Sequence, residues 1–169
     1  MLKPSTTTYP EYFQQYVNQV PEENIYTAFE NQLPVIKAFL DNISEEKANY
    51  AYAEGKWTLK ELLQHIIDAE RIFCYRALCF ARKESQSLPG FDENDYAINS
   101  DANRRTWLSL ADEFLALRRT TEILFETFSR EMLQESGMAN NKPTNVISMG
   151  FITVGHFYHH KRVVDERYF

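Results

Sequence analysis

Three of the four histidines in this chain lie close together, at His156, His159 and His160. In a helix each residue turns the chain by about 100°, so His156 and His160 would share a face and lie about 6 Å apart along the axis. That face also carries the apolar residues Ile152 and Val163, whereas His159 would lie about 60° to the other side. The spacing therefore predicts that His156 and His160 point into the protein and that His159 faces away.

Two neutral imidazoles four residues apart on a helix can bind one divalent ion. The remaining histidine, His65, lies on the border of the apolar stripe of an earlier helical segment, from which it could supply a third nitrogen. Structural zinc sites are closed by four protein ligands, whereas catalytic sites keep a position open. A site of His65, His156 and His160 would be open. Histidine pairs at this spacing also occur without metal, and that alternative stays open.

Two further polar residues lie near this face of the earlier helical segment. Asp68 follows His65 by three residues, so it could orient a ligand or a bound water, or be a solvated acid. Arg76 lies on the apolar stripe itself, where a guanidinium is costly unless it is paired or faces a cavity. It could hold an anionic substrate group or pair with an internal acid such as Glu70 or Glu113, and we favour the pairing.

The elements that must position these residues are helices, because apolar residues recur at intervals of three and four along the chain. Thr58 and Glu61 form a capping-box pattern at the start of the segment that carries His65. Pro34 predicts a kink in the first segment, or two abutting helices. The expected helices span about residues 22–43, 58–82, 100–131 and 145 to near the end, with turns or loops at 83–99 and 136–145.

Four amphipathic helices of this length predict an all-α fold, a four-helix bundle whose long connections allow crossovers. The length of 169 residues, with 44% hydrophobic residues, predicts a single domain over residues 1–169, its first ~20 residues forming an extension packed on the bundle. The net charge of −6 argues against nucleic acid and anionic membranes as partners. Without a signal peptide or a membrane-spanning apolar run, we expect a cytoplasmic protein.

Three separated segments resemble the DinB-like (YfiT-like) superfamily of metal-dependent enzymes. They read GKWTLKELLQH at residues 55–65, LPGFDENDY at residues 88–96 and GHFYHH at residues 155–160. The resemblance spans roughly residues 12–168 and implies a four-helix bundle with crossover connections. It also implies one divalent ion held by three histidines, at the positions of His65, His156 and His160.

The resemblance implies that the protein is an enzyme, because relatives of this kind include S-transferases that use low-molecular-weight thiols, and hydrolases. We expect a thiol S-transferase; the alternatives are a metal-dependent hydrolase and a non-catalytic helical interaction protein with a structural metal. Three imidazoles favour zinc or nickel, with iron or manganese as further options. The expected partner is a small-molecule substrate such as a low-molecular-weight thiol, and the sequence leaves a homodimer open.

Overall fold

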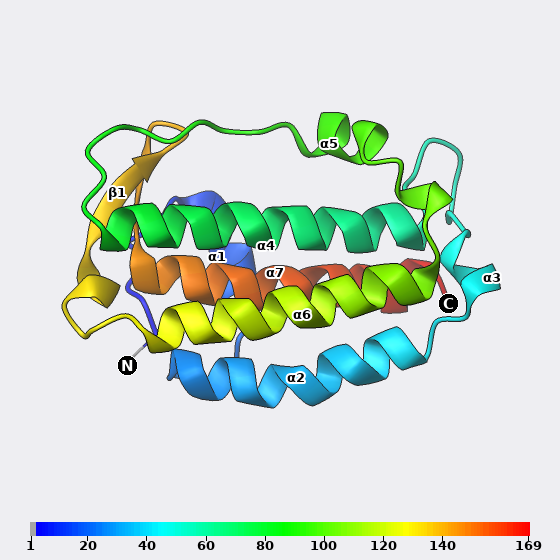
Figure 1. Cartoon of the computed structure of the whole chain (residues 1–169), viewed down its shortest axis with the longest axis horizontal. Helices are drawn as coiled ribbons and strands as arrows, with labels where there is room; N and C mark the ends of the chain where they lie inside the picture. Colours follow the sequence, from blue (N-terminus) through cyan, green and yellow to red (C-terminus); the bar gives the residue numbers. More distant parts are fainter. Residues whose placement is uncertain (1–2) are drawn as a thin grey trace.

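The computed structural model describes residues 3–169. Its core is a bundle of four long helices, in which α4 packs against α6 and α7, and α2 packs against the same two helices (Figure 1). These helices are α2 (Ile25–Asp41), α4 (Leu59–Ala81), α6 (Trp107–Glu126) and α7 (Val146–Arg167). The shorter elements are η1 (Glu11–Phe13), α1 (Gln14–Val17), α3 (Glu45–Ala48), α5 (Glu93–Asn99), η2 (Ala102–Arg104), η3 (Met132–Gln134), β1 (Ser136–Ala139) and β2 (Lys142–Asn145). The predicted four-helix bundle is confirmed.

The connection between α4 and α6 is a crossover. It runs back along the length of the bundle, so that α4 and α6 point in the same direction while α2 and α7 point in the other (Figure 1). We expected only turns at residues 83–99, but α5 lies within this stretch. Asp92 caps α5 by accepting hydrogen bonds from the backbone N–H groups of Asn94 and Asp95. A short helix with no long apolar stripe leaves little periodic signal in the sequence.

Helix starts follow local side-chain chemistry. The capping box of α4 is present, because the Thr58 hydroxyl accepts from the Glu61 N–H at 3.1 Å and the Glu61 carboxylate accepts from the Thr58 N–H at 2.8 Å. Of the two residues expected to cap the last helix, Thr144 and Asn145, it is Asn145 that caps α7. The cap of α6 is Thr106, so the helix begins later than the expected start near residue 100.

Helix α2 is continuous although Pro34 lies inside it. The alternative of two abutting helices is therefore wrong. The helix starts after Asn24, whose side chain accepts hydrogen bonds from the N–H groups of Tyr26 and Thr27. The missing N–H of a proline removes one intrahelical bond, and packing of α2 against α6 and α7 offsets that loss.

Residues 136–145 form an antiparallel hairpin, β1 and β2, where we expected a loop. The turn consists of Asn140 and Asn141, both with positive φ, which is the conformation that two-residue hairpins require and that asparagine tolerates. Leu88 in the crossover pairs with this hairpin, donating to the Met138 carbonyl and accepting from the Asn140 N–H. The crossover is thereby fixed to the hairpin above α4.

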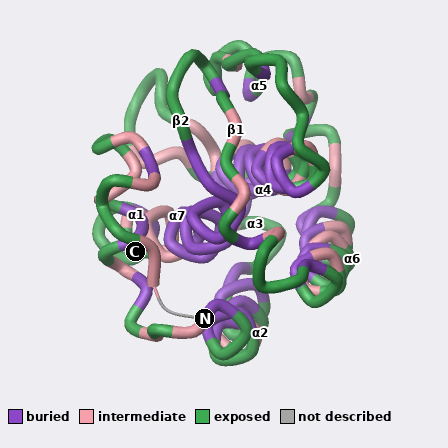
Figure 2. Tube along the Cα trace, turned by 90° about the vertical axis from the view of Figure 1, so that its left-hand side faces the viewer, coloured by how far each residue is buried: buried purple, intermediate pink, exposed green. Residues whose placement is uncertain are grey.

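Helix α7 is the central helix, since every residue from Val146 to Phe157 is buried (Figure 2). We expected one apolar face, but α1 covers the side of α7 that the other long helices leave open. Gly155 permits this contact, because a Cβ atom there would lie 2.1 Å from the backbone oxygen of Tyr16. The close approach brings Tyr16 next to His156.

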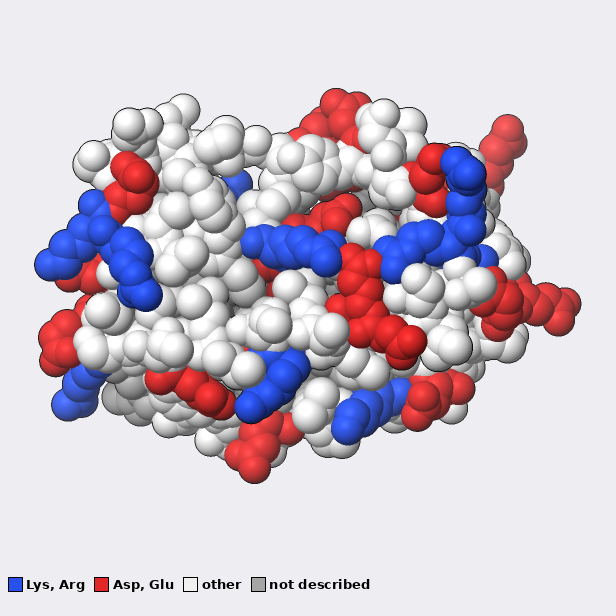
Figure 3. All heavy atoms as spheres, viewed as in Figure 1, with Lys and Arg blue, Asp and Glu red and all other residues white. Residues whose placement is uncertain are grey.

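The surface carries charges of both signs. On the face shown in Figure 3, Lys and Arg alternate with Asp and Glu, and no large patch of a single sign is visible. No helix within residues 3–169 combines the length and the apolarity that crossing a membrane would require.

Candidate metal centre

Three histidines converge between α4 and α7. The Nε2 atom of His156 lies 3.1 Å from Nε2 of His65 and 3.0 Å from Nε2 of His160. Nitrogen atoms of all three rings lie within 4.8 Å of one another. The structure thus brings together the three residues that helical spacing and the family resemblance selected, although His65 and His156 are 91 residues apart.

The donor set fits a divalent ion. Nitrogen ligands about 2.1 Å from one ion at angles of about 90–110° would lie roughly 3.0–3.4 Å apart. The distances from Nε2 of His156 to Nε2 of His65 and of His160 fall in this range. A neutral imidazole nitrogen either donates or accepts one hydrogen bond. Three Nε2 atoms that meet at one point therefore cannot fully satisfy one another, whereas a single cation can accept all three lone pairs.

Burial keeps these rings neutral, which is the form that binds metal. It lowers the pKa of His65 to about 4, with a smaller contribution from His159. Burial also lowers the pKa values of His156 and His160 well below the ordinary 6.5, and the neighbouring histidines add to the effect. At pH 7 all three side chains offer free lone pairs.

Aromatic side chains hold the histidines in place. The centre of the Trp57 ring lies 4.8 Å from that of His65. The rings of Tyr16 and Phe73 pack edge-on with the His156 ring, at 5.3 and 5.6 Å between ring centres. Trp57 stands within the GKW segment and Tyr16 in the N-terminal extension. Neither was identified from the sequence as a site residue, because an aromatic residue in a helical protein is most often part of the core.

His159 does not face away from the site as predicted. Its side chain is half-buried and lines a cavity beside the three converging histidines. The centre of its ring lies 5.1 Å from the ring centres of Tyr16 and His160. Its Nδ1 atom is buried and has no hydrogen-bond partner among the described residues. His159 remains outside the group of three converging nitrogens. The prediction treated the outer side of the helix as solvent, whereas α1 covers it.

A cavity of about 580 Å³ opens beside the three histidines. Its walls come from α4, α7, the crossover, the hairpin and the N-terminal segment that contains α1. Aromatic side chains form part of the lining, among them Tyr12, Phe13, Phe73 and Phe91. This size and lining are typical of a site for a small molecule.

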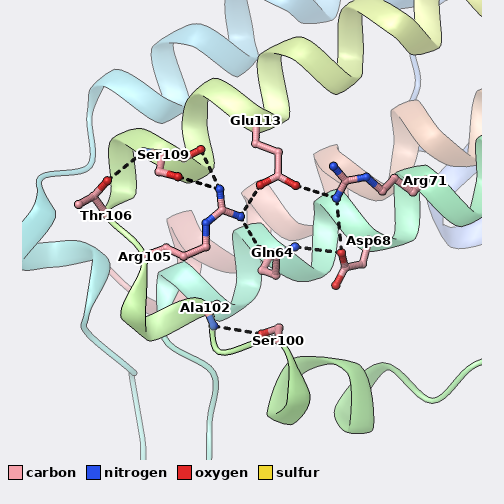
Figure 4. Close-up of polar contacts among 9 residues, drawn as sticks. All are labelled: Gln64, Asp68, Arg71, Ser100, Ala102, Arg105, Thr106, Ser109 and Glu113. Carbon is pink, nitrogen blue, oxygen red and sulfur yellow. Dashed lines mark hydrogen bonds and ion pairs between the residues drawn. The ribbon is translucent and has the colours of Figure 1, made fainter.

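Asp68 does not line this cavity. Its carboxylate accepts a hydrogen bond from Gln64 at 2.9 Å and lies 3.8 Å from Arg71 (Figure 4). Arg71 also pairs with Glu113, which in turn binds Arg105, so Asp68 is part of an ionic network between α4 and α6. The sequence left open whether Asp68 orients a ligand or bound water or is a solvated acid, and these contacts include no metal ligand.

Arg76 lines the cavity and is 6% exposed. Its Nη2 atom donates to the Pro89 carbonyl at 2.9 Å. The pairing that we favoured is absent, because Glu70 pairs with Arg118 and Glu113 pairs with the two arginines of the network. Burial lowers the pKa of Arg76, and no carboxylate of residues 3–169 forms an ion pair with it.

Comparison with known families gives a match over most of the chain. The sequence pattern of the DinB superfamily matches residues 28–164, a stretch that contains all three converging histidines. The chain belongs to the DinB superfamily. The N-terminal wall of the cavity, with Tyr12 and Tyr16, lies outside the part that matches the DinB pattern.

One relative of this DinB-superfamily chain, and one solved structure that is similar in fold, have names that refer to hydrolysis. A protein of Oceanobacillus iheyensis named "Putative metal-dependent hydrolase" is 27% identical over 92 residues, which are 50% of this chain. The match spans about half the length of that relative, 53%. YfiT from Bacillus subtilis, described as "a probable metal-dependent hydrolase with an unusual four-helix bundle topology", superposes with a TM-score of 0.72. The superposition covers 97% of this chain and 90% of YfiT at 14% sequence identity, and so shows that the two proteins share a fold.

Proposed function

We propose that this chain is a metal-dependent hydrolase in which His65, His156 and His160 hold one divalent ion. The observation that carries the proposal is the convergence of three neutral imidazole nitrogens, from the buried His65 and His156 and the half-buried His160, at the wall of a cavity of about 580 Å³. Structural zinc sites normally have four protein ligands. In the part of the chain that the structure describes this group has three, and it faces a space for a small molecule. Both features favour catalysis over a purely structural metal.

A divalent ion in such a site lowers the pKa of water and polarises a carbonyl or phosphoryl oxygen. The residues of the chain supply the surroundings for that chemistry. Trp57, Phe73 and Tyr16 shield the three nitrogens from bulk water, which strengthens electrostatic interactions within the site. Burial raises the pKa of the Tyr16 hydroxyl, which lies 3.1 Å from the Tyr12 hydroxyl. Where Tyr12 is the donor in that hydrogen bond, the Tyr16 hydroxyl can donate to a substrate oxygen.

Water is the nucleophile that we favour over a thiol. Our expectation of a thiol S-transferase came from the family resemblance. The names of the Oceanobacillus iheyensis and Bacillus subtilis relatives refer to hydrolases and mention no thiol. Thiol specificity therefore has no support from these comparisons. Zinc and nickel are the ions that we favour, because three imidazoles suit both.

The test combines metal analysis with two assays. Purified protein is loaded with zinc or nickel near pH 8, dialysed, and examined by elemental analysis. We expect close to one equivalent in the wild type and in His159→Ala, and under about a tenth of an equivalent in His156→Ala and His160→Ala. The loaded protein is then incubated with a panel of activated esters and amides, with and without cysteine as a small thiol.

We expect hydrolysis that needs the ion and does not increase with the thiol. Strict dependence on the thiol, with formation of a thiol conjugate, would contradict the choice of water. Failure of the wild type to retain metal after loading would contradict the metal site itself and would favour the non-catalytic alternative.

A further inference from the structure

Arg76 is a buried cation without a counter-charge. Its guanidinium carries five N–H donors, and the structure shows one of them in use, with the carbonyl of Pro89. A charge removed from water is costly unless another charge compensates it. The side chain is only 6% exposed and lines the cavity, so little of it is in contact with bulk solvent. The missing partner is therefore to be sought among molecules that enter the cavity.

The position of Arg76 sets a distance from the three histidines. His65 and Arg76 lie on the same helix, eleven residues apart, which corresponds to about 16 Å along the axis. Helical side chains lean toward the N-terminus, so the Arg76 side chain leans toward His65. Phe73 lies between them and contacts the ring of His156. An apolar surface thus connects the histidines to the guanidinium.

Two other charged residues line the same cavity. Lys142, on β2, adds a second positive charge. Glu93, at the start of α5, contributes a negative charge that helps to raise the pKa of Tyr16, and it forms no ion pair with Arg76. The cavity therefore has two cationic side chains against one carboxylate, in a protein whose net charge is −6.

We propose that the substrate is an elongated molecule with a carboxylate bound by Arg76, an apolar body along Phe73, and its reacting bond at the three histidines. The planar fork of a guanidinium matches a carboxylate with two parallel hydrogen bonds. The position of the reacting bond rests on the proposed function. The binding of the carboxylate by Arg76 does not, and it can be measured separately.

The test compares two probes that differ only in charge, 4-phenylbutyrate and its neutral amide, 4-phenylbutanamide. Their affinities for the metal-loaded protein are measured by isothermal titration calorimetry. We expect the wild type to bind the carboxylate on the order of tenfold or more tightly than the amide, because hydrogen bonds to charged groups are the strong ones. In Arg76→Gln this preference should fall below about threefold, and in Arg76→Lys it should be intermediate.

Three variants serve as controls. Arg82→Gln removes an exposed arginine at the end of the same helix, outside the cavity lining, and should leave the preference unchanged. Lys142→Gln should weaken binding of the carboxylate by about twofold, because it removes a charge opposite to that of the probe. Glu93→Gln should strengthen binding by a similar factor, because it removes a charge of the same sign as that of the probe. These opposite changes in affinity report whether the carboxylate of the probe lies in the cavity, so the proposal stays testable even if the Arg76 variants fold poorly.

A preference that survives in Arg76→Gln would overturn the proposal, since the carboxylate would then bind at the histidine site. Lower thermal stability of Arg76→Gln with unchanged probe affinities would also overturn it and would assign Arg76 to holding Pro89 in place. Metal content is measured on the same samples. A wild type that retains no metal but still prefers the carboxylate would refute the proposed hydrolase and leave the role of Arg76 intact.

Discussion

The bundle contains two buried polar clusters that differ in how their groups are satisfied. In the first, the Arg118 guanidinium binds both carboxylate oxygens of Glu70, at 3.0 and 2.7 Å, and the side chain of Gln32. Thr121 donates to the same carboxylate at 2.7 Å, and Gln32 donates to the Val154 carbonyl at 2.8 Å. Every charge in this cluster has its opposite within the chain.

The second cluster, His65, His156 and His160, consists of three like groups with no carboxylate among them. Both clusters lie largely inside the protein, although His160 is only half-buried, so burial alone does not distinguish structure from function. Complementarity does: the Arg118 cluster is complete without a ligand, whereas the histidine cluster is completed by a cation. Arg76 resembles the histidine cluster in this respect, because none of the described residues forms an ion pair with it.

The largest expected effect comes from breaking the complete cluster. Glu70→Leu leaves the Arg118 charge buried without its partner, and we expect the free energy of unfolding to fall by about 3–5 kcal/mol. Urea unfolding followed by circular dichroism measures this loss. Glu70→Leu combined with Arg118→Met removes both charges and should recover most of the stability. A loss below about 1 kcal/mol in the single variant would show that the pair is not tightly coupled.

A comparable effect is expected for the histidine cluster, but only when metal is present. Zinc at about a thousand times its dissociation constant should stabilise the wild type by about 4 kcal/mol. His156→Ala should lose this stabilisation, whereas His159→Ala should retain most of it. Thermal unfolding with and without zinc measures the difference. Equal metal-induced stabilisation in the two variants would mean that the assignment of ligands is wrong.

The metal-free protein should lose stability in mildly acidic solution. The folded protein holds the pKa of His65 at about 4, against 6.5 for an ordinary histidine. Between these values the unfolded chain binds a proton that the folded protein does not, so the free energy of unfolding falls as the pH falls from 6.5 to about 4. The loss for His65 is on the order of 3 kcal/mol. Urea unfolding at several pH values should show a flatter dependence in His65→Asn; an identical slope would contradict the origin in this residue.

The smallest effect concerns a thiol beside the complete cluster. Cys74 lies 3.2 Å from the Thr121 hydroxyl, and burial, together with the charge of Glu70, raises its pKa to about 12. Because the thiolate is the reactive form, iodoacetamide at pH 8 should alkylate Cys74 at least tenfold more slowly in the folded protein than in urea. Mass spectrometry of peptides measures both rates. Similar rates in the two states would show that this part of the bundle opens easily.

The sequence predicted those parts of the molecule whose causes are local. The capping box at Thr58 and the cap at Asn145 depend on residues within three positions, and both were found as expected. The inward direction of His156 and His160 follows from helical spacing alone. The third histidine needed either an assumption about which helices are neighbours or the family resemblance.

Features that depend on distant contacts were missed. The hairpin at residues 136–145 is stabilised partly by Leu88, which is about fifty residues away along the chain. His159 was expected to face away from the site because nothing in its own helix indicates that α1 covers it. Arg76 was assigned an acidic partner because periodicity places it on the apolar stripe but cannot show which acids are already taken.

His65 and His156 are separated by 91 positions in the sequence, and this separation has a consequence for the dynamics of the whole chain. A shared ion would be a reversible cross-link between α4 and α7, closing a loop that includes the crossover, α6 and the hairpin. Cross-links restrict an unfolded chain more strongly as the loop they close becomes longer. The bundle could then open fully only after the ion leaves, so the rate of metal release would set the lifetime of the folded protein.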